Sequence, residues 1–88
     1  MKKLVSLKDL LEKEDKAVKN YNMILELIKN ENERFENNRE KYINVGLEDL
    51  HKKNHNERIN EYNKDLDSTT RIVEAQRRKI KDYFLKLD

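Results

Sequence analysis

Two histidines, His51 and His55, come closest in type and spacing to residues that could perform site chemistry. Residues four apart on a helix share a face, and two imidazoles so placed have the spacing of metal ligands. Glu48, one turn earlier, could add a third ligand. The zinc-protease motif requires Glu directly after the first His, but Lys52 stands there, and Lys52 and Lys53 would repel a cation. We therefore interpret the pair as ordinary polar surface and expect no metal and no other cofactor.

The acidic residues are numerous but predict no catalytic pair. Many lie three or four positions from a base, as Glu12 does from Lys16, which is the spacing of ion pairs along a helix surface. Acid–base catalysis needs a concave site that excludes water. A single glycine, Gly46, also rules out a glycine-rich phosphate loop. We expect a protein that is not an enzyme.

Aromatic and basic residues could together indicate nucleic-acid binding. The four tyrosines all fall on positions of the heptad repeat described below, so we predict that they pack in the interface between helices. The net charge is only +2, and the bases of the C-terminal segment are interleaved with acids. We interpret that segment as a solvated helix face and expect nucleic-acid binding to be absent. Its candidate basic contact patch consists of Arg77, Arg78, Lys79 and Lys81.

The elements that must position these residues are two long helices. The sequence contains no proline, and its one glycine, Gly46, lies near the midpoint of 88 residues, so helix breakers are absent elsewhere. Ser6 is a candidate N-cap, and Glu48 and Asp49 suit the first turn of a second helix. The sequence predicts one all-α domain over residues 1–88. It is an antiparallel two-helix hairpin with arms at about 6–43 and 47–87 and a turn near Val45 and Gly46.

A seven-residue repeat supports this hairpin, because apolar rows at heptad spacing form the contact between paired helices. The rows of the first arm are Leu4, Leu11, Val18, Leu25, Asn32 and Arg39, and Leu7, Glu14, Tyr21, Ile28, Phe35 and Tyr42. The rows of the second arm are Ile59, Leu66, Val73, Ile80 and Leu87, and Tyr62, Thr69, Gln76 and Tyr83. A turn at Gly46 makes the numbers of facing residues add to about 91, so that Leu11 would face Ile80. A break at Asp67 to Thr70 remains an alternative, and it would give three helices.

Two helices of this composition bury little apolar surface, so we predict a bundle completed by a second copy or by another helical protein. Apolar residues outside the predicted rows gather where the two ends of the hairpin meet. The predicted partner interface consists of Leu7, Leu10, Ile24, Leu27, Ile72, Phe84 and Leu85.

The sequence contains no stretch long and apolar enough for a membrane span, and Lys8 and Asp9 interrupt the apolar N-terminal residues at once. We expect no membrane insertion and a cytoplasmic protein, or one exported without a cleaved signal peptide. The sequence has no cysteine, so it predicts no disulfide.

The turn Asn44-Val45-Gly46 and the C-terminal Phe84-Leu85-Lys86-Leu87-Asp88 resemble parts of the Trp-x-Gly helical hairpin proteins of type VII secretion. The chain looks still more like the small helical proteins that accompany toxins through that system. In it, Asn44 occupies the place of the family's tryptophan. The resemblance implies a helical partner, export of the complex and an aromatic-x-x-x-acid export signal at Phe84 and Asp88.

Two functions follow as hypotheses. The first is a non-enzymatic adaptor that binds a helical protein and assists export of a toxin by type VII secretion. The second is a small regulatory or inhibitory protein, encoded by a phage or mobile element, that binds a host protein or nucleic-acid complex. In the second hypothesis the basic patch would carry the contacts.

Overall fold

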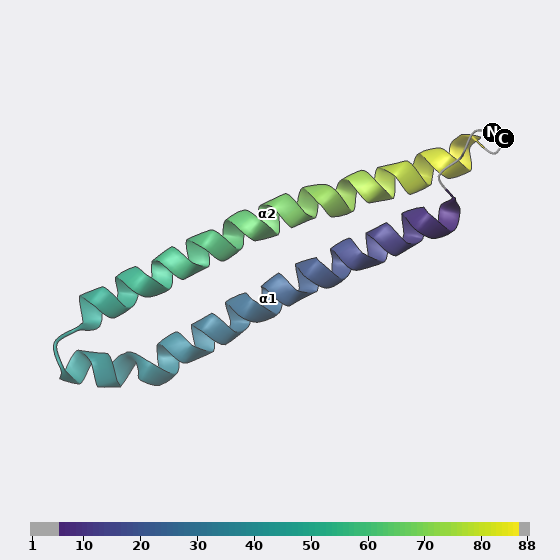
Figure 1. Ribbon diagram of the computed structural model, residues 1–88. Coiled ribbons are helices and arrows are strands. Elements are labelled where there is room, and N and C mark those ends of the chain that lie inside the picture. Colours follow the sequence, from purple (N-terminus) through teal and green to yellow (C-terminus); the bar gives the residue numbers. More distant parts are fainter. Residues whose placement is uncertain (1–5, 87–88) are drawn as a thin grey trace.

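The protein is a hairpin of two long antiparallel helices, as predicted (Figure 1). The computed structural model describes residues 6–86, and Leu4, Leu87 and Asp88 therefore lie outside the described residues. Helix α1 spans Leu7–Asn44 and α2 spans Glu48–Lys86. The molecule is a rod with extents of 67 × 19 × 16 Å. Neither described helix is long and apolar enough to cross a membrane.

The ends of the helices follow from local chemistry. The Ser6 side chain accepts a hydrogen bond from the Asp9 backbone N–H at 3.1 Å, which confirms the predicted N-cap of α1. At the other end Gly46 has a φ of 76°, a conformation that costs glycine little. The Gly46 N–H donates to the Ile43 carbonyl, and the Leu47 N–H donates to the Tyr42 carbonyl. These two bonds form a Schellman motif, which ends α1 and reverses the chain.

Helix α2 is continuous from the turn to Lys86, so the alternative of a third helix is wrong. The residues 67–70, which could have capped a new helix, remain helical. The Thr70 hydroxyl donates to the Leu66 carbonyl at 2.8 Å, which is the bond that a threonine makes inside a helix.

The side chains that α1 turns toward α2 follow a strict heptad repeat. One row is the predicted one that runs from Leu7 to Tyr42. The second row is Leu10, Ala17, Ile24, Glu31 and Asn38, which lies one position before the predicted row of Leu11, Val18 and Leu25. The predicted second row of α1 is therefore wrong. Because both rows begin with apolar residues and end with polar ones, composition did not distinguish them.

The inward-facing rows of α2 agree with the prediction from Ile59 to Tyr83. Nearer the turn the spacing changes, because the next inward residues are His55 and His51, whereas a seven-residue step back from Ile59 would reach Lys52. The predicted sum of about 91 for facing residues also agrees with the contacts, although Leu11, which was predicted to face Ile80, is exposed. Glu14 pairs with Arg77, and Phe35 stacks on His55, pairs whose numbers add to 91 and 90.

Two halves of the rod have different interiors. We call residues 6–25 and 62–86 the open half, and residues 26–61 the turn half. The buried apolar residues Leu10, Ala17, Ile24 and Val73 all belong to the open half. In the turn half the one buried residue among those described is Glu31.

Candidate interaction face

An apolar row lies on α1 directly beside the buried row of the open half. Its residues Leu11, Val18 and Leu25 each follow a buried residue by one position, about 100° round the helix from it, so they lie at the edge of the contact with α2. Leu11 is 45% exposed and Leu25 is 41% exposed, whereas Leu10 is only 6% exposed. Helix α1 therefore presents a second apolar row, parallel to the one it uses inside the hairpin.

Helix α2 adds to the same side of the rod. Arg77 reaches across the helix contact to Glu14, with Nε donating to Oε2 at 2.9 Å. Glu14 lies between Leu11 and Val18 on α1, and Phe84 lies two turns beyond Arg77 on α2. The Phe84 side chain is 52% exposed, and its ring meets Tyr83 edge to face. We call Leu11, Val18, Leu25 and Phe84 the apolar face.

The predicted partner interface is only partly found on this face. Leu10 and Ile24 are wrong, because they are buried against α2 inside the hairpin. Leu7 is half-buried at the start of the inner row. The cause is the one-position shift of the second row, which exchanges the roles of Leu10 and Leu11.

The other predicted interface residues are exposed but do not form one surface. Leu27 and Ile72 lie on the opposite flank of the hairpin from Leu25, since Leu27 follows the buried Ile24 by three positions and Ile72 precedes the buried Val73. Leu85 is exposed on the outer side of α2. Of the predicted set, Phe84 belongs to the apolar face. Its predicted export-signal partner, Asp88, lies outside the described residues.

The predicted basic patch divides between two sides of α2. Arg77, Arg78 and Lys81 line one shallow hollow together with Glu74, beside the apolar face. Lys79 is not among the residues of that hollow. Arg77 is already paired with Glu14, so the bases available to another molecule at this edge are Arg78 and Lys81.

The turn half contains an aromatic stack that was not predicted from the sequence. Rings from the two helices alternate in the order Tyr42, His51, Phe35 and His55. Successive ring centres are 4.3, 4.5 and 4.2 Å apart, and the planes lie within 26° of parallel. The interpretation of the two histidines as ordinary polar surface is therefore wrong, because both rings are half-buried in the contact between helices.

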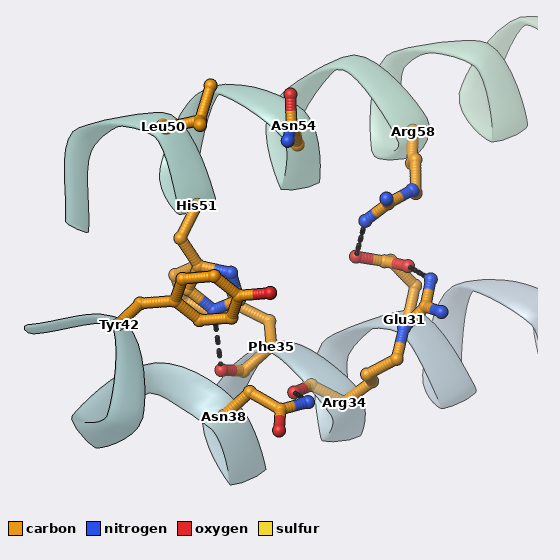
Figure 2. Close-up of a pocket in the computed structure, with 9 residues that line it drawn as sticks. All are labelled: Glu31, Arg34, Phe35, Asn38, Tyr42, Leu50, His51, Asn54 and Arg58. Carbon is orange, nitrogen blue, oxygen red and sulfur yellow. Dashed lines mark hydrogen bonds and ion pairs between the residues drawn. The ribbon is translucent and has the colours of Figure 1, made fainter. Parts of the chain in front are cut away.

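The stack ends at the buried carboxylate of Glu31, which is 4% exposed. One carboxylate oxygen, Oε2, accepts a hydrogen bond from His55 Nδ1 at 2.9 Å and lies 3.5 Å from Arg58 Nη1. The other oxygen, Oε1, accepts from Arg34 Nη2 (Figure 2). Burial alone would raise the pKa of Glu31, but the hydrogen bonds from Arg34 and His55 and the charges of Arg34 and Arg58 outweigh it and lower that pKa.

Hydrogen bonds also set which ring nitrogens of the histidines carry protons. The His51 Nε2 atom lies 3.1 Å from the Phe35 carbonyl oxygen, which can only accept (Figure 2). His55 Nδ1 likewise faces a carboxylate. Each histidine therefore donates through the named nitrogen, and each ring is fixed by a bond and by stacking. Among the described residues there is no group of three or more acidic or histidine side chains placed to hold a metal ion.

These side chains border a hollow of about 220 Å³ on one flank of the turn half. Figure 2 shows it between Leu50 and Asn54 of α2 and Asn38 and Tyr42 of α1. The charged groups on its floor are occupied with one another, because Glu31 holds both Arg34 and Arg58. We interpret this cluster as the structural core of the turn half.

No family model, curated protein sequence or solved structure matches this chain.

Proposed function

We propose that this protein is a non-enzymatic interaction module that binds a helix of another protein along its apolar face. The observation that supports the proposal most directly is the pair of neighbouring apolar rows on α1. One row, which includes Leu10 and Ile24, is used inside the hairpin, and the other, which includes Leu11 and Leu25, is exposed. A helix with two such rows suits a bundle of three or more helices, because each row serves a different neighbour.

The thin interior of the hairpin supports the same proposal. Four apolar residues are buried among those described, and no side chain of residues 6–86 is completely enclosed. A partner helix laid over Leu11, Val18 and Leu25 would also cover Leu7, Tyr21 and Ile28, the half-buried inner residues three or four positions from that row. Each fully buried leucine or valine contributes about 1.5–3 kcal/mol relative to exposure, so binding and folding would stabilise one another.

Photo-crosslinking tests the proposal in the cells that produce the protein. A photoreactive amino acid replaces Leu11 or Leu25, and in the matched control it replaces Met23, which is exposed on another side of α1. We expect positions 11 and 25 to give an adduct with a helical segment of one other protein, and position 23 to give none. Equal labelling from position 23, or no adduct, would reject the face. An adduct with a second copy would keep the face but replace the proposed partner.

Substitutions on the apolar face test the same proposal by the affinity for the partner. Leu11→Lys with Leu25→Lys should abolish association with the crosslinked partner, since two charges would be placed in an apolar contact. Met23→Lys should leave association unchanged. Circular dichroism of each variant checks that the helices are retained, because all three positions are exposed in the free hairpin.

For the biological role we propose an adaptor that assists export of a toxin by type VII secretion. The support is the resemblance of the turn and the C-terminal segment to that family, together with the hairpin shape and the exposure of Phe84. Co-expression with a candidate toxin and the secretion ATPase tests this role. Export that fails after Phe84→Ala, while the complex still forms, would support it, whereas unchanged export would argue against the signal.

A second candidate function is a regulatory protein that contacts its target through basic residues. The hollow that Arg77, Arg78 and Lys81 line with Glu74 is the observation in its favour. In that case charge reversal at Arg78 should weaken binding more than Leu11→Lys does. A nucleic-acid target would further show affinity that falls steeply with salt, because each phosphate contact releases counterions.

A further inference from the structure

We infer that the partner helix is acidic along one edge, and that this edge lies beside Lys81 and the hollow that Arg78 also lines, while its apolar side lies on the apolar face. The inference rests on the proposed function and names the chemistry of the partner. It comes from two surfaces that are adjacent in the structure. The Glu14–Arg77 ion pair joins them, since Glu14 lies between Leu11 and Val18, and Arg77 borders the hollow that Arg78 and Lys81 line with Glu74.

The position of the bases sets the geometry. Arg77 and Phe84 lie on the flank of α2 that shares a side of the rod with Leu11 and Leu25, and Lys81, one turn from Arg77, lies next to them. Arg78 follows Arg77 by one position, so it is turned about 100° farther round α2, toward the outer side with Leu85, and lines the same hollow. A helix laid over the face would therefore have one edge beside Lys81 and next to the hollow that Arg78 also lines. Arg77 Nε donates to Glu14 Oε2 at 2.9 Å, so the Arg77 side chain is held in place and its charge is already paired.

The net charge of the open half also favours an acidic partner. Residues 6–25 and 62–86 contain 11 lysines and arginines and 8 aspartates and glutamates, a net charge of +3, whereas residues 26–61 have a net charge of −2. Two copies joined through their open halves would bring two positive halves together. Like charges across an interface disfavour association, and opposite charges favour it. An acidic helix is therefore a better occupant of this face than a second copy.

Synthetic helices test the inference on the full-length protein. The probe is a labelled peptide of about four heptads, with leucine along one side and glutamate along one edge, and the comparison peptide has lysine at the same edge. Fluorescence anisotropy measures both affinities. We expect the acidic peptide to bind about tenfold more tightly at low salt, and this preference to shrink at high ionic strength as the charges are screened.

Variants with equal charge changes locate the preference. Arg78→Glu with Lys81→Glu should remove or invert it. The matched control is Lys79→Glu with Lys86→Glu, which alters charge by the same amount at positions spaced seven apart on the opposite flank of α2 and should leave the preference unchanged.

The outcomes separate this inference from the proposed function. If both peptides bind alike and Leu11→Lys abolishes both, the apolar face stands and the acidic edge is overturned. If the control pair changes the preference as much as the test pair does, the effect is one of total charge, and the inference is again overturned. If neither peptide binds, an acidic helix is rejected as the ligand, and the crosslinking experiment alone decides the face.

Discussion

The open half and the turn half use the same two helices but hold them together by different chemistry. In the open half apolar residues are buried, and one ion pair, Glu14 with Arg77, links the helices among the described residues. In the turn half four stacked rings and a buried carboxylate take the place of an apolar core.

This difference separates two tasks within one hairpin. Apolar rows accept several registers at similar free energy, whereas a buried Glu31 must meet both His55 and Arg58, which only one register allows. The best-attested use of a buried polar group is to fix register in this way. The turn half therefore aligns the helices, and the open half retains apolar surface for a partner.

The largest expected effect in this comparison comes from removing the ring at the centre of the stack. Phe35→Ala should destabilise the protein by about 3 kcal/mol, because the ring packs between two histidines. Hydrogen exchange should show lost protection in the turn half before the open half. Equal loss of protection throughout the rod would contradict the division into two halves.

A pair of neighbouring leucines tests the corrected inner row of the open half. Leu10→Ala should cost about 2–3 kcal/mol, because Leu10 is buried against α2. Leu11→Ala should change the free energy of unfolding by less than about 0.5 kcal/mol, because Leu11 is exposed in the free hairpin. Urea unfolding of both variants measures the difference. A larger effect at Leu11 would restore the row predicted from the sequence.

The buried carboxylate gives the turn half a pH dependence of its own. Glu31→Gln should cost about 2 kcal/mol at neutral pH, since Arg34, His55 and Arg58 lose a charged acceptor. The pKa of Glu31 is lower in the folded protein than its ordinary value of 4.5. Its contribution is therefore complete above that value and is lost as the pH falls through the folded pKa.

The gap in stability between the native protein and Glu31→Gln should consequently narrow in acid. Thermal unfolding of both proteins over a series of pH values measures it. A gap that stays constant would mean that ionisation of Glu31 adds nothing to folding.

The smallest expected effect is a gain in stability. The Gln76 side-chain oxygen Oε1 is buried and has no hydrogen-bond partner within the described residues. Gln76→Leu should stabilise the protein by about 1 kcal/mol and raise Tm by several degrees, because an unsatisfied polar atom is replaced by an apolar group of similar size. A lower Tm would show that Gln76 has a partner in solution, such as a water molecule.

Much of the fold could be predicted from the sequence, because the decisive features are local. Gly46 supplied the turn, Ser6 supplied the cap, and the rows from Ile59 to Tyr83 followed from seven-residue spacing. These features depend on residues near one another in the chain, where propensity and capping act directly.

The candidate site was harder to predict, because two choices depend on contact across the hairpin. Rows starting at Leu10 and at Leu11 are both apolar, and the side that faces α2 is set by packing along the whole helix. A strict heptad extended backward from Ile59 would place Lys52 inward, whereas the rings of Phe35 and Tyr42 stack on His51. The amino-acid composition does not reveal a change of spacing of this kind.

The Gly46 turn has a practical consequence for studying the protein. A side chain built at Gly46 would meet nothing within 4 Å, although its φ of 76° would still strain any other residue there. The turn lies at the opposite end of a 67 Å rod from the C-terminal end of α2, which carries Phe84 (Figure 1). A fluorophore or an epitope inserted in this turn would lie far from a partner bound near the other end of the rod. The hairpin would then act as a rigid spacer between the label and that partner.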